Sequence, residues 1–352
     1  MSNEILKQDE MLFADLCKII DSTKHRVATV VNSSITLMYW GVGNRINTEL
    51  LNNERAEYGK QIVVTVSQQL QERYGKRGFE YSNVTRMMKF ATLIPDYQIV
   101  VTLSQQLSWS HFIATLPLKD EVQREFYLTM ASSERWGVRT LRERIDSMLY
   151  ERTVISGKPE EFVKQELAKL RDDNVLSPDL VFKSPYFLDF TGLKGFYSEH
   201  DLEDMLLSEL QKFILELGGG FTFVERQKRM VIDGEDFKLD LLFYHRKLRR
   251  LIAIDLKLGK FKAAYKGQME LYLRWLDKYE RQEGEESPLG LLLCSEGGRE
   301  QIELLKLGEA GIQVSQYYTE LPDKKLLEEH LHRQMKIAQE RVDMQYEGNV
   351  EV

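Results

Sequence analysis

The spacing of hydrophobic residues changes part of the way along the chain. Over residues 1–150, apolar side chains recur every three or four positions, as in VATVVNSSITLMYWGVGNRI and YGKQIVVTVSQQLQERYG. That spacing is typical of amphipathic helices, and the alternation expected of strands is scarce in this region. The pattern therefore predicts a mainly helical N-terminal domain.

Residues 151–190 have a different character. A short charged helix, PEEFVKQELAKLRDD, is followed by LSPDLVFKSPYFLDF, in which Pro178 and Pro185 disfavour a helix at the residues before them. We expect a linker and an extended arm in this region.

The next part of the chain alternates helices and strands. Helices are predicted over 198–217 and 263–279, and strands near 221–232, 237–245, 250–258 and 290–295. A helix near 299–307 and a strand over 312–318 follow. This αβββαβ order predicts an α/β domain over 191–320, a mixed sheet flanked by helices, with a charged helix and tail over 321–352.

Two of the predicted strands carry charged residues among apolar ones. Asp240 lies in LDLLFY, and Asp255 and Lys257 lie in LIAIDLKL. A hairpin centred near residues 247 and 248 would place Asp240 about opposite Asp255, with Lys257 on the face of Asp255. Like charges opposite each other destabilise a sheet, so the pattern predicts a bound cation, and hard oxygen ligands suit Mg²⁺.

The flanking helices offer further polar candidates. The apolar stripe of the first helix leads back by one turn to Glu203, and it is predicted to pass through Leu207, Leu210, Ile214 and Leu217. On the helix over 263–279, Gln268 lies one turn before the apolar face. Glu225, on the first strand, is a further acidic candidate whose facing the pattern leaves open.

The overall composition is that of an ordinary globular protein, with 43% hydrophobic and 29% charged residues. A net charge of −7 argues against coating of nucleic acid by bulk electrostatics, but residues 246–262 hold seven Lys or Arg against one Asp. We predict two groups of nucleic-acid contacts: Arg246, Lys247, Arg249, Arg250, Lys260 and Lys262 in the α/β domain, and Lys76, Arg77, Arg86 and Lys89 in the helical domain.

The two cysteines, Cys17 and Cys294, form neither a zinc signature nor a disulfide framework. The chain shows no export signal and no apolar run long enough to span a membrane. We therefore expect a cytoplasmic protein that does not engage membranes.

Glu203, Asp240, the Asp255-Leu256-Lys257 triplet and Gln268, in an αβββαβ order, resemble the PD-(D/E)XK nuclease superfamily. More closely, GEDFKLDLLFYHRKLR, LSWSHF and YWGVGNRI resemble the bacterial YhcG family, which pairs a helical N-terminal domain with a nuclease-like domain. The resemblance extends from about Val31 to Tyr318. This chain has Asp255 where that family usually has Glu, and the superfamily accepts either acid.

The resemblance implies a restriction-endonuclease-like domain that hydrolyses phosphodiester bonds with Mg²⁺ or Mn²⁺ as cofactor. DNA is the expected substrate rather than RNA. Asp240, Asp255 and Glu203 would hold the metal, and Lys257 would orient the attacking water or stabilise negative charge. Gln268 would position the nucleophile or a phosphate oxygen. The N-terminal domain would bind DNA, in a winged-helix-like manner, or a protein partner, and a homo-oligomer is compatible with this reading.

Each of these residues also has a structural explanation. Asp240 could pair with Arg250, Lys257 could extend to the surface, and Glu203 could interact with the helix dipole. The basic HRKLRR segment could be a solvated hairpin tip. The alternative function is a nucleic-acid-binding or protein-binding factor that keeps a nuclease fold without cleaving, whereas intact Asp240, Asp255 and Lys257 favour the enzyme.

Overall fold

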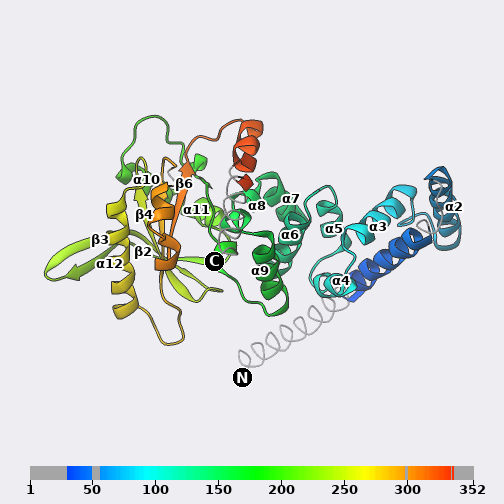
Figure 1. Ribbon diagram of the computed structural model, residues 1–352, viewed down its shortest axis with the longest axis horizontal. Coiled ribbons are helices and arrows are strands. Elements are labelled where there is room, and N and C mark those ends of the chain that lie inside the picture. Colours follow the sequence, from blue (N-terminus) through cyan, green and yellow to red (C-terminus); the bar gives the residue numbers. More distant parts are fainter. Residues whose placement is uncertain (1–29, 50–55, 298–299, 334, 337–352) are drawn as a thin grey trace, which may run out of the picture. The chain divides into compact units, whose positions relative to one another are not determined.

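The computed structural model describes residues 30–49, 56–297, 300–333 and 335–336, and the chain divides into two compact units between Asp146 and Ser147 (Figure 1). The part of the predicted helical domain before residue 30, Cys17 included, lies outside the described residues, as does the tail after residue 336. No helix in the described part is long and apolar enough to cross a membrane.

The first unit is helical, as predicted. A helix over residues 30–49 is followed by α2 (Ala56–Tyr74), α3 (Tyr81–Leu93), α4 (Tyr97–Ser104), α5 (Trp109–Thr115), α6 (Glu121–Glu134) and α7 (Val138–Asp146). Across 30–49 and 56–146 the structure contains no strand, so this part of the chain lacks the β wing of the winged-helix option.

The helix over 30–49 packs tightly on α3 because one of its residues has no side chain. A Cβ atom on Gly43 would lie 2.0 Å from the carbonyl oxygen of Met87. Gly41, on the same helix, has nothing within 4 Å of its Cβ position. Around this contact, Ile46 of the helix clusters with Val63 and Val84. The absence of a side chain at Gly43 thus lets the two helix backbones approach closely beside this apolar cluster.

The second unit is built on a six-stranded mixed sheet with the order β1-β6-β5-β4-β3-β2. The strands are β1 (Tyr186–Phe187), β2 (Phe221–Ile232), β3 (Glu235–His245), β4 (Arg250–Lys257), β5 (Leu289–Cys294) and β6 (Ile312–Tyr318). The β2, β3 and β4 strands run antiparallel, whereas β4, β5, β6 and β1 run parallel. This arrangement confirms the predicted mixed sheet.

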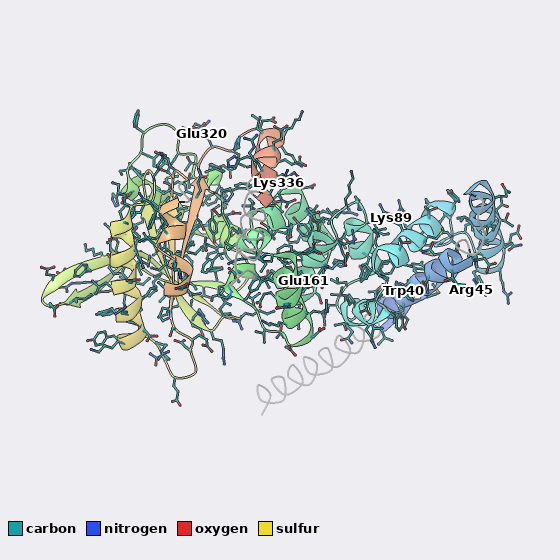
Figure 2. All side chains as sticks on the ribbon, viewed as in Figure 1. Trp40, Arg45, Lys89, Glu161, Glu320 and Lys336 are labelled. Atoms are coloured by element: carbon teal, nitrogen blue, oxygen red, sulfur yellow. The ribbon has the colours of Figure 1, made fainter. Side chains whose placement is uncertain are left out.

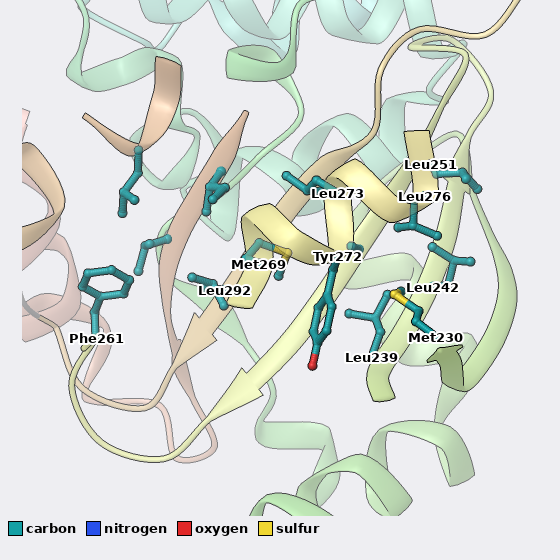
Figure 3. Close-up of a cluster of buried hydrophobic side chains, with 14 of the residues drawn as sticks. Met230, Leu239, Leu242, Leu251, Phe261, Met269, Tyr272, Leu273, Leu276 and Leu292 are labelled. Atoms are coloured by element: carbon teal, nitrogen blue, oxygen red, sulfur yellow. The ribbon is translucent and has the colours of Figure 1, made fainter. Parts of the chain in front are cut away.

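Helices cover both faces of the sheet. On one face, α12 (Ala263–Tyr279) packs Met269, Tyr272 and Leu276 against a cluster that includes Leu242 and Leu251 (Figure 3). On the other face, α11 (Leu210–Leu217) places the Phe213 ring 5.9 Å from the ring of Phe243. Because neighbouring strand residues point to opposite faces, Leu242 and Phe243 assign α12 and α11 to opposite sides.

The predicted helix over 198–217 is two helices, α10 (Glu199–Ser208) and α11, separated at Glu209 (φ −109°, ψ 30°). The interruption changes which residues face the core. Instead of Leu207, Leu210 and Ile214, the buried residues are Leu202, Glu203, Leu206, Phe213 and Leu217. The predicted apolar stripe was therefore wrong, although Glu203 is buried and Leu217 belongs to both sets.

The segment 151–190, where a linker and arm were expected, belongs to the second unit. It begins within α8 (Leu149–Arg152), contains α9 (Glu160–Asp172), and ends just after β1, which pairs with β6. The buried Arg152 side chain donates from Nη1 to Glu216 Oε1 of α11 at 2.6 Å, so this segment is fastened to the α/β core.

The second unit also contains α13 (Glu300–Leu304), before β6, and a helix over 324–333, after β6. Leu327 and Leu331 of the latter pack on Met148.

We predict that Gly43→Ala destabilises the helical unit by about 1–3 kcal/mol, because a methyl group must displace the Met87 backbone. The matched change Gly41→Ala, at an open helical position, should stabilise by about 0.5–1 kcal/mol. Thermal melting of the two variants beside the parent measures both effects. Equal melting temperatures for the two variants would contradict the close approach.

Candidate active site

The site forms where β3 and β4 separate. Their pairing runs from His245 opposite Arg250 to Leu241 opposite Ile254, and the next position brings Asp240 opposite Asp255, as the predicted hairpin requires. There the Asp240 side chain enters the gap between the strands, and its Oδ2 accepts a hydrogen bond of 2.8 Å from the backbone N–H of Leu256. A carboxylate thus takes a place that a backbone carbonyl would fill in a regular ladder.

Asp255 is almost completely buried, at 2% exposure, and Lys257 Nζ lies 2.7 Å from its Oδ2. Burial, and then the neighbouring Asp240 carboxylate, raise the pKa of Asp255 to about 7, although Lys257 opposes the shift. The two carboxyl groups are neighbours, so the negative charge of Asp240 disfavours ionisation of Asp255. Burial lowers the pKa of Lys257, but Asp255 more than offsets this and the net shift is upward.

Glu203 of α10 joins this pair through an amide. The Gln227 Nε2 atom lies 2.7 Å from Glu203 Oε2 and 3.4 Å from Asp240 Oδ1. Glu203 is buried, at 4% exposure, and its burial together with the Asp240 charge raises its pKa. Its Oε1 accepts no hydrogen bond from the residues that the structure describes, although Arg226 Nε lies 3.4 Å away.

A cavity of about 390 Å³ opens onto these groups. It is lined by Glu199, His200, Glu203, Arg226, Gln227, Lys238 and Asp240. Asp255, which is buried, and Lys257 are not among the lining residues. A ligand in the cavity would therefore meet Asp240 and Glu203 first.

Gln268 reaches the site through another residue. Its Nε2 donates to the Tyr272 hydroxyl at 2.6 Å, and that hydroxyl donates to the carbonyl oxygen of Lys238 at 3.1 Å. Figure 3 shows the Tyr272 ring extending from α12 with its hydroxyl at the edge of the apolar cluster. Gln268 and Tyr272 thus connect α12 to the part of β3 that carries Asp240.

The donor atoms suit a hard divalent cation, although they are not assembled as a complete cage. Within the described residues, no group of three or more Asp, Glu, His or Cys side chains is placed to hold a metal ion together. However, Glu203 Oε1 is buried without a hydrogen-bond donor, and Asp240 and Asp255 are adjacent like charges. A divalent cation would supply the positive charge that both features lack.

The predicted basic contacts fall into separate places. Arg246, Lys247, Arg249 and Arg250 lie at the far end of the β3–β4 hairpin, and Arg250 is about 16 Å along β4 from Asp255. Arg249 and Arg250 face Glu286. Arg250 therefore does not pair with Asp240, which was the structural explanation considered for Asp240. The Lys247 ammonium donates to Asn174 Oδ1 at 3.1 Å.

Lys260 and Lys262 lie just beyond the site end of β4. Lys262 Nζ lies 5.9 Å from the centre of the Tyr265 ring, and Lys257 Nζ lies 5.3 Å from the same centre. In the helical unit, Lys76 and Arg77 are exposed after α2, and Arg86 and Lys89 are exposed on α3, where Figure 2 labels Lys89. The exposed residues of this set are Lys260, Lys262, Lys76, Arg77, Arg86 and Lys89.

The sequence reasoning missed several residues of the site. Gln227, Glu199, His200 and Arg226 all line the cavity, and the Glu199 Oε1 atom accepts a hydrogen bond from the Leu258 N–H at 2.9 Å. The polar residues flanking Glu203 on its own helix were the available signal for Glu199 and His200. Glu225, by contrast, is half exposed and pairs with Lys228 at 3.1 Å.

Comparisons with known proteins agree with this architecture. The DUF1016 N-terminal domain model matches residues 15–152, and the YhcG PDDEXK nuclease domain model matches residues 179–335. The Escherichia coli (strain K12) protein YhcG, a nuclease candidate by name, is 32% identical over 353 aligned residues, which cover 92% of this chain and 93% of that protein. The second match includes Glu203, Asp240, Asp255, Lys257 and Gln268.

A solved structure is also similar in part. The crystal structure of a repair endonuclease from Pyrococcus abyssi matches 37% of this chain and 50% of its own, at 18% identity and a TM-score of 0.26.

We predict that the protein without divalent cations loses stability as the pH rises from about 4 to about 7 through ionisation of Asp255. Its pKa is higher in the folded chain than in the unfolded chain, so the folded state binds the proton more tightly and stability falls as that proton leaves. Melting temperatures in chelator at pH 5 and pH 8 should show a smaller decrease for Asp255→Asn than for the parent. Equal decreases would contradict the assignment.

Proposed function

This chain belongs to the YhcG family, and on that premise we propose that it is a nuclease that uses Mg²⁺ or Mn²⁺ to hydrolyse phosphodiester bonds, with DNA as its substrate. The observation that carries the proposal is the buried contact between Asp240 and Asp255 beside Lys257. A pair of carboxylates kept together at such electrostatic cost is typical of a site that binds a cation.

The chain's own residues would divide the work as follows. Asp240, Asp255 and Glu203 would hold the cation, which polarises the phosphate and acidifies water when bound. Lys257 would stabilise negative charge that develops on the phosphate, because its ammonium lies beside Asp255. Gln268 would act through Tyr272, by holding β3 and α12 in register beside the site.

The cavity supports a phosphate-containing substrate. Arg226 and Lys238 supply positive charge at its lining, and Lys260 and Lys262 extend the basic surface beyond β4. The basic residues at the hairpin tip lie too far along β4 to contact the same phosphate, so they would meet a neighbouring part of a longer nucleic acid. The exposed Lys76, Arg77, Arg86 and Lys89 of the helical unit would contact DNA or a protein partner.

A second candidate function is favoured by one observation. Gln227 separates Glu203 from Asp240, and the described residues hold no complete metal cage. A factor that binds nucleic acid or protein through a nuclease fold without cleaving would fit that arrangement.

Cytoplasmic location and homo-oligomer formation stay predictions from the sequence.

We predict cleavage of DNA by the purified protein in Mg²⁺ or Mn²⁺ and none in chelator. The assay compares linear, nicked, single-stranded and branched DNA, and RNA, each under the three conditions. Binding without cleavage on every substrate would establish the second candidate instead, and cleavage of RNA alone would correct the substrate.

Asp240→Asn and Lys257→Ala should be alike in activity and opposite in metal affinity. Asp240→Asn removes a negative charge from the metal ligands, so it should weaken Mg²⁺ binding and abolish cleavage. Lys257→Ala removes a competing cation, so Mg²⁺ should bind at least as tightly while cleavage is lost. In chelator, Asp240→Asn should be more stable by about 1 kcal/mol, because repulsion with Asp255 is relieved.

Calorimetric Mg²⁺ titrations and melting curves measure these effects. Asp236→Asn is the matched control, because Asp236 lies on the same strand, is exposed and pairs with Arg229. If Asp240→Asn bound Mg²⁺ like the parent and melted lower in chelator, Asp240 would be a structural residue.

A further inference from the structure

Gln227 occupies an unusual position on β2. The β2–β3 register pairs Arg226 with Leu241 and Lys228 with Leu239, which brings Gln227 opposite Asp240. Its backbone has a φ of 48°, in the left-handed region that residues other than glycine rarely adopt. In a regular strand Arg226 and Gln227 would point to opposite faces, yet both line the cavity. The irregular backbone therefore delivers two neighbouring side chains to one site.

The Gln227 amide lies between two carboxylates. Its Nε2 has two N–H donors, and it lies within hydrogen-bond distance of both Glu203 Oε2 and Asp240 Oδ1. The opposite orientation of the amide would set its carbonyl oxygen against two anionic oxygens, so the chemistry of the neighbours determines which atom points inward. The amide nitrogen thus provides, in neutral form, the positive pole that two adjacent carboxylates require.

Glu203 depends on this contact more than Asp240 does. Asp240 also accepts the hydrogen bond from the Leu256 N–H through Oδ2. Among the described residues, Gln227 donates the one hydrogen bond that Glu203 accepts, since Oε1 accepts none and His200 Nδ1 is 4.0 Å from Oε2. Without the amide, a buried carboxylate would face Asp240 with Arg226 as its nearest cation.

We propose that the Gln227 amide stands in for the divalent cation between Glu203 and Asp240 in the metal-free protein, and that the cation must displace it to bind. This rests on the proposed function, because it assumes that the carboxylates are metal ligands. Gln227 is then a positioning residue: it holds the Glu203 and Asp240 carboxylates in the metal-free protein, and it would lower the metal affinity by competing for the same oxygens.

The proposal fixes the direction of two measurements. Gln227→Ala leaves the backbone at a left-handed φ, as in the parent, but removes the amide. The metal-free state loses its hydrogen bonds, so the melting temperature in chelator should fall by roughly 2–4 °C. The metal-bound state loses nothing, so Mg²⁺ and Mn²⁺ should bind about tenfold more tightly.

Gln227→Met serves as a second variant, because it keeps the length and much of the packing of glutamine without a donor. It should change metal affinity in the same direction as Gln227→Ala, which keeps the test decisive if the alanine variant does not fold. Gln211→Ala, at an exposed position of α11, is the matched control and should match the parent in both measurements.

Calorimetric titration with Mg²⁺ and Mn²⁺ and melting curves in chelator decide the question without reference to cleavage. Unchanged or weaker metal binding in both Gln227 variants, with a parent that binds metal, would overturn this inference and leave the proposed function standing. That result would mean that the amide stays in place, or that its oxygen becomes a ligand. A parent that neither binds metal nor cleaves would overturn both.

Discussion

Electrostatic repulsion between the Asp240 and Asp255 carboxylates governs the arrangement of everything around them. The β3–β4 hairpin forces the two side chains to be neighbours, and the burial of Asp255 removes water that would screen the pair on that side. Three nearby groups offset that repulsion: the Lys257 ammonium, the Leu256 N–H and the Gln227 amide. These are the positive poles available to a protein without a bound cation.

The parts of the site that the sequence could predict follow from local rules. Alternation along a strand and a short hairpin together place Asp240, Asp255 and Lys257, because a single register satisfies both the apolar faces and the turn. The burial of Glu203 was predicted from a stripe of apolar residues that the structure does not have. The helix breaks at Glu209, which rotates the second half relative to the first, and Glu203 is buried together with Leu202 and Leu206 instead.

The residues that could not be predicted depend on departures from regular geometry. Gln227 reads in the sequence as one more polar position on an edge strand, and nothing local announces its left-handed backbone. Tyr272 is buried in the apolar cluster, but its hydroxyl also links Gln268 to β3, and the spacing of apolar residues gives no signal of that role. The basic residues of the hairpin tip are close to Asp255 in sequence, whereas an extended strand carries them away from it in space.

The charge of the cavity bears on the order in which ligands bind. Its lining carries the carboxylates of Glu199, Glu203 and Asp240 against the cations of Arg226 and Lys238, and the Asp255–Lys257 pair behind them is balanced. Without a divalent cation this surface repels a phosphate group near Asp240. If the proposed nuclease function holds, the cation must therefore bind before the scissile phosphate or together with it. Before the cation binds, the amide of Gln227 can hold the Glu203 and Asp240 carboxylates in place, because it donates hydrogen bonds to them without adding a charge.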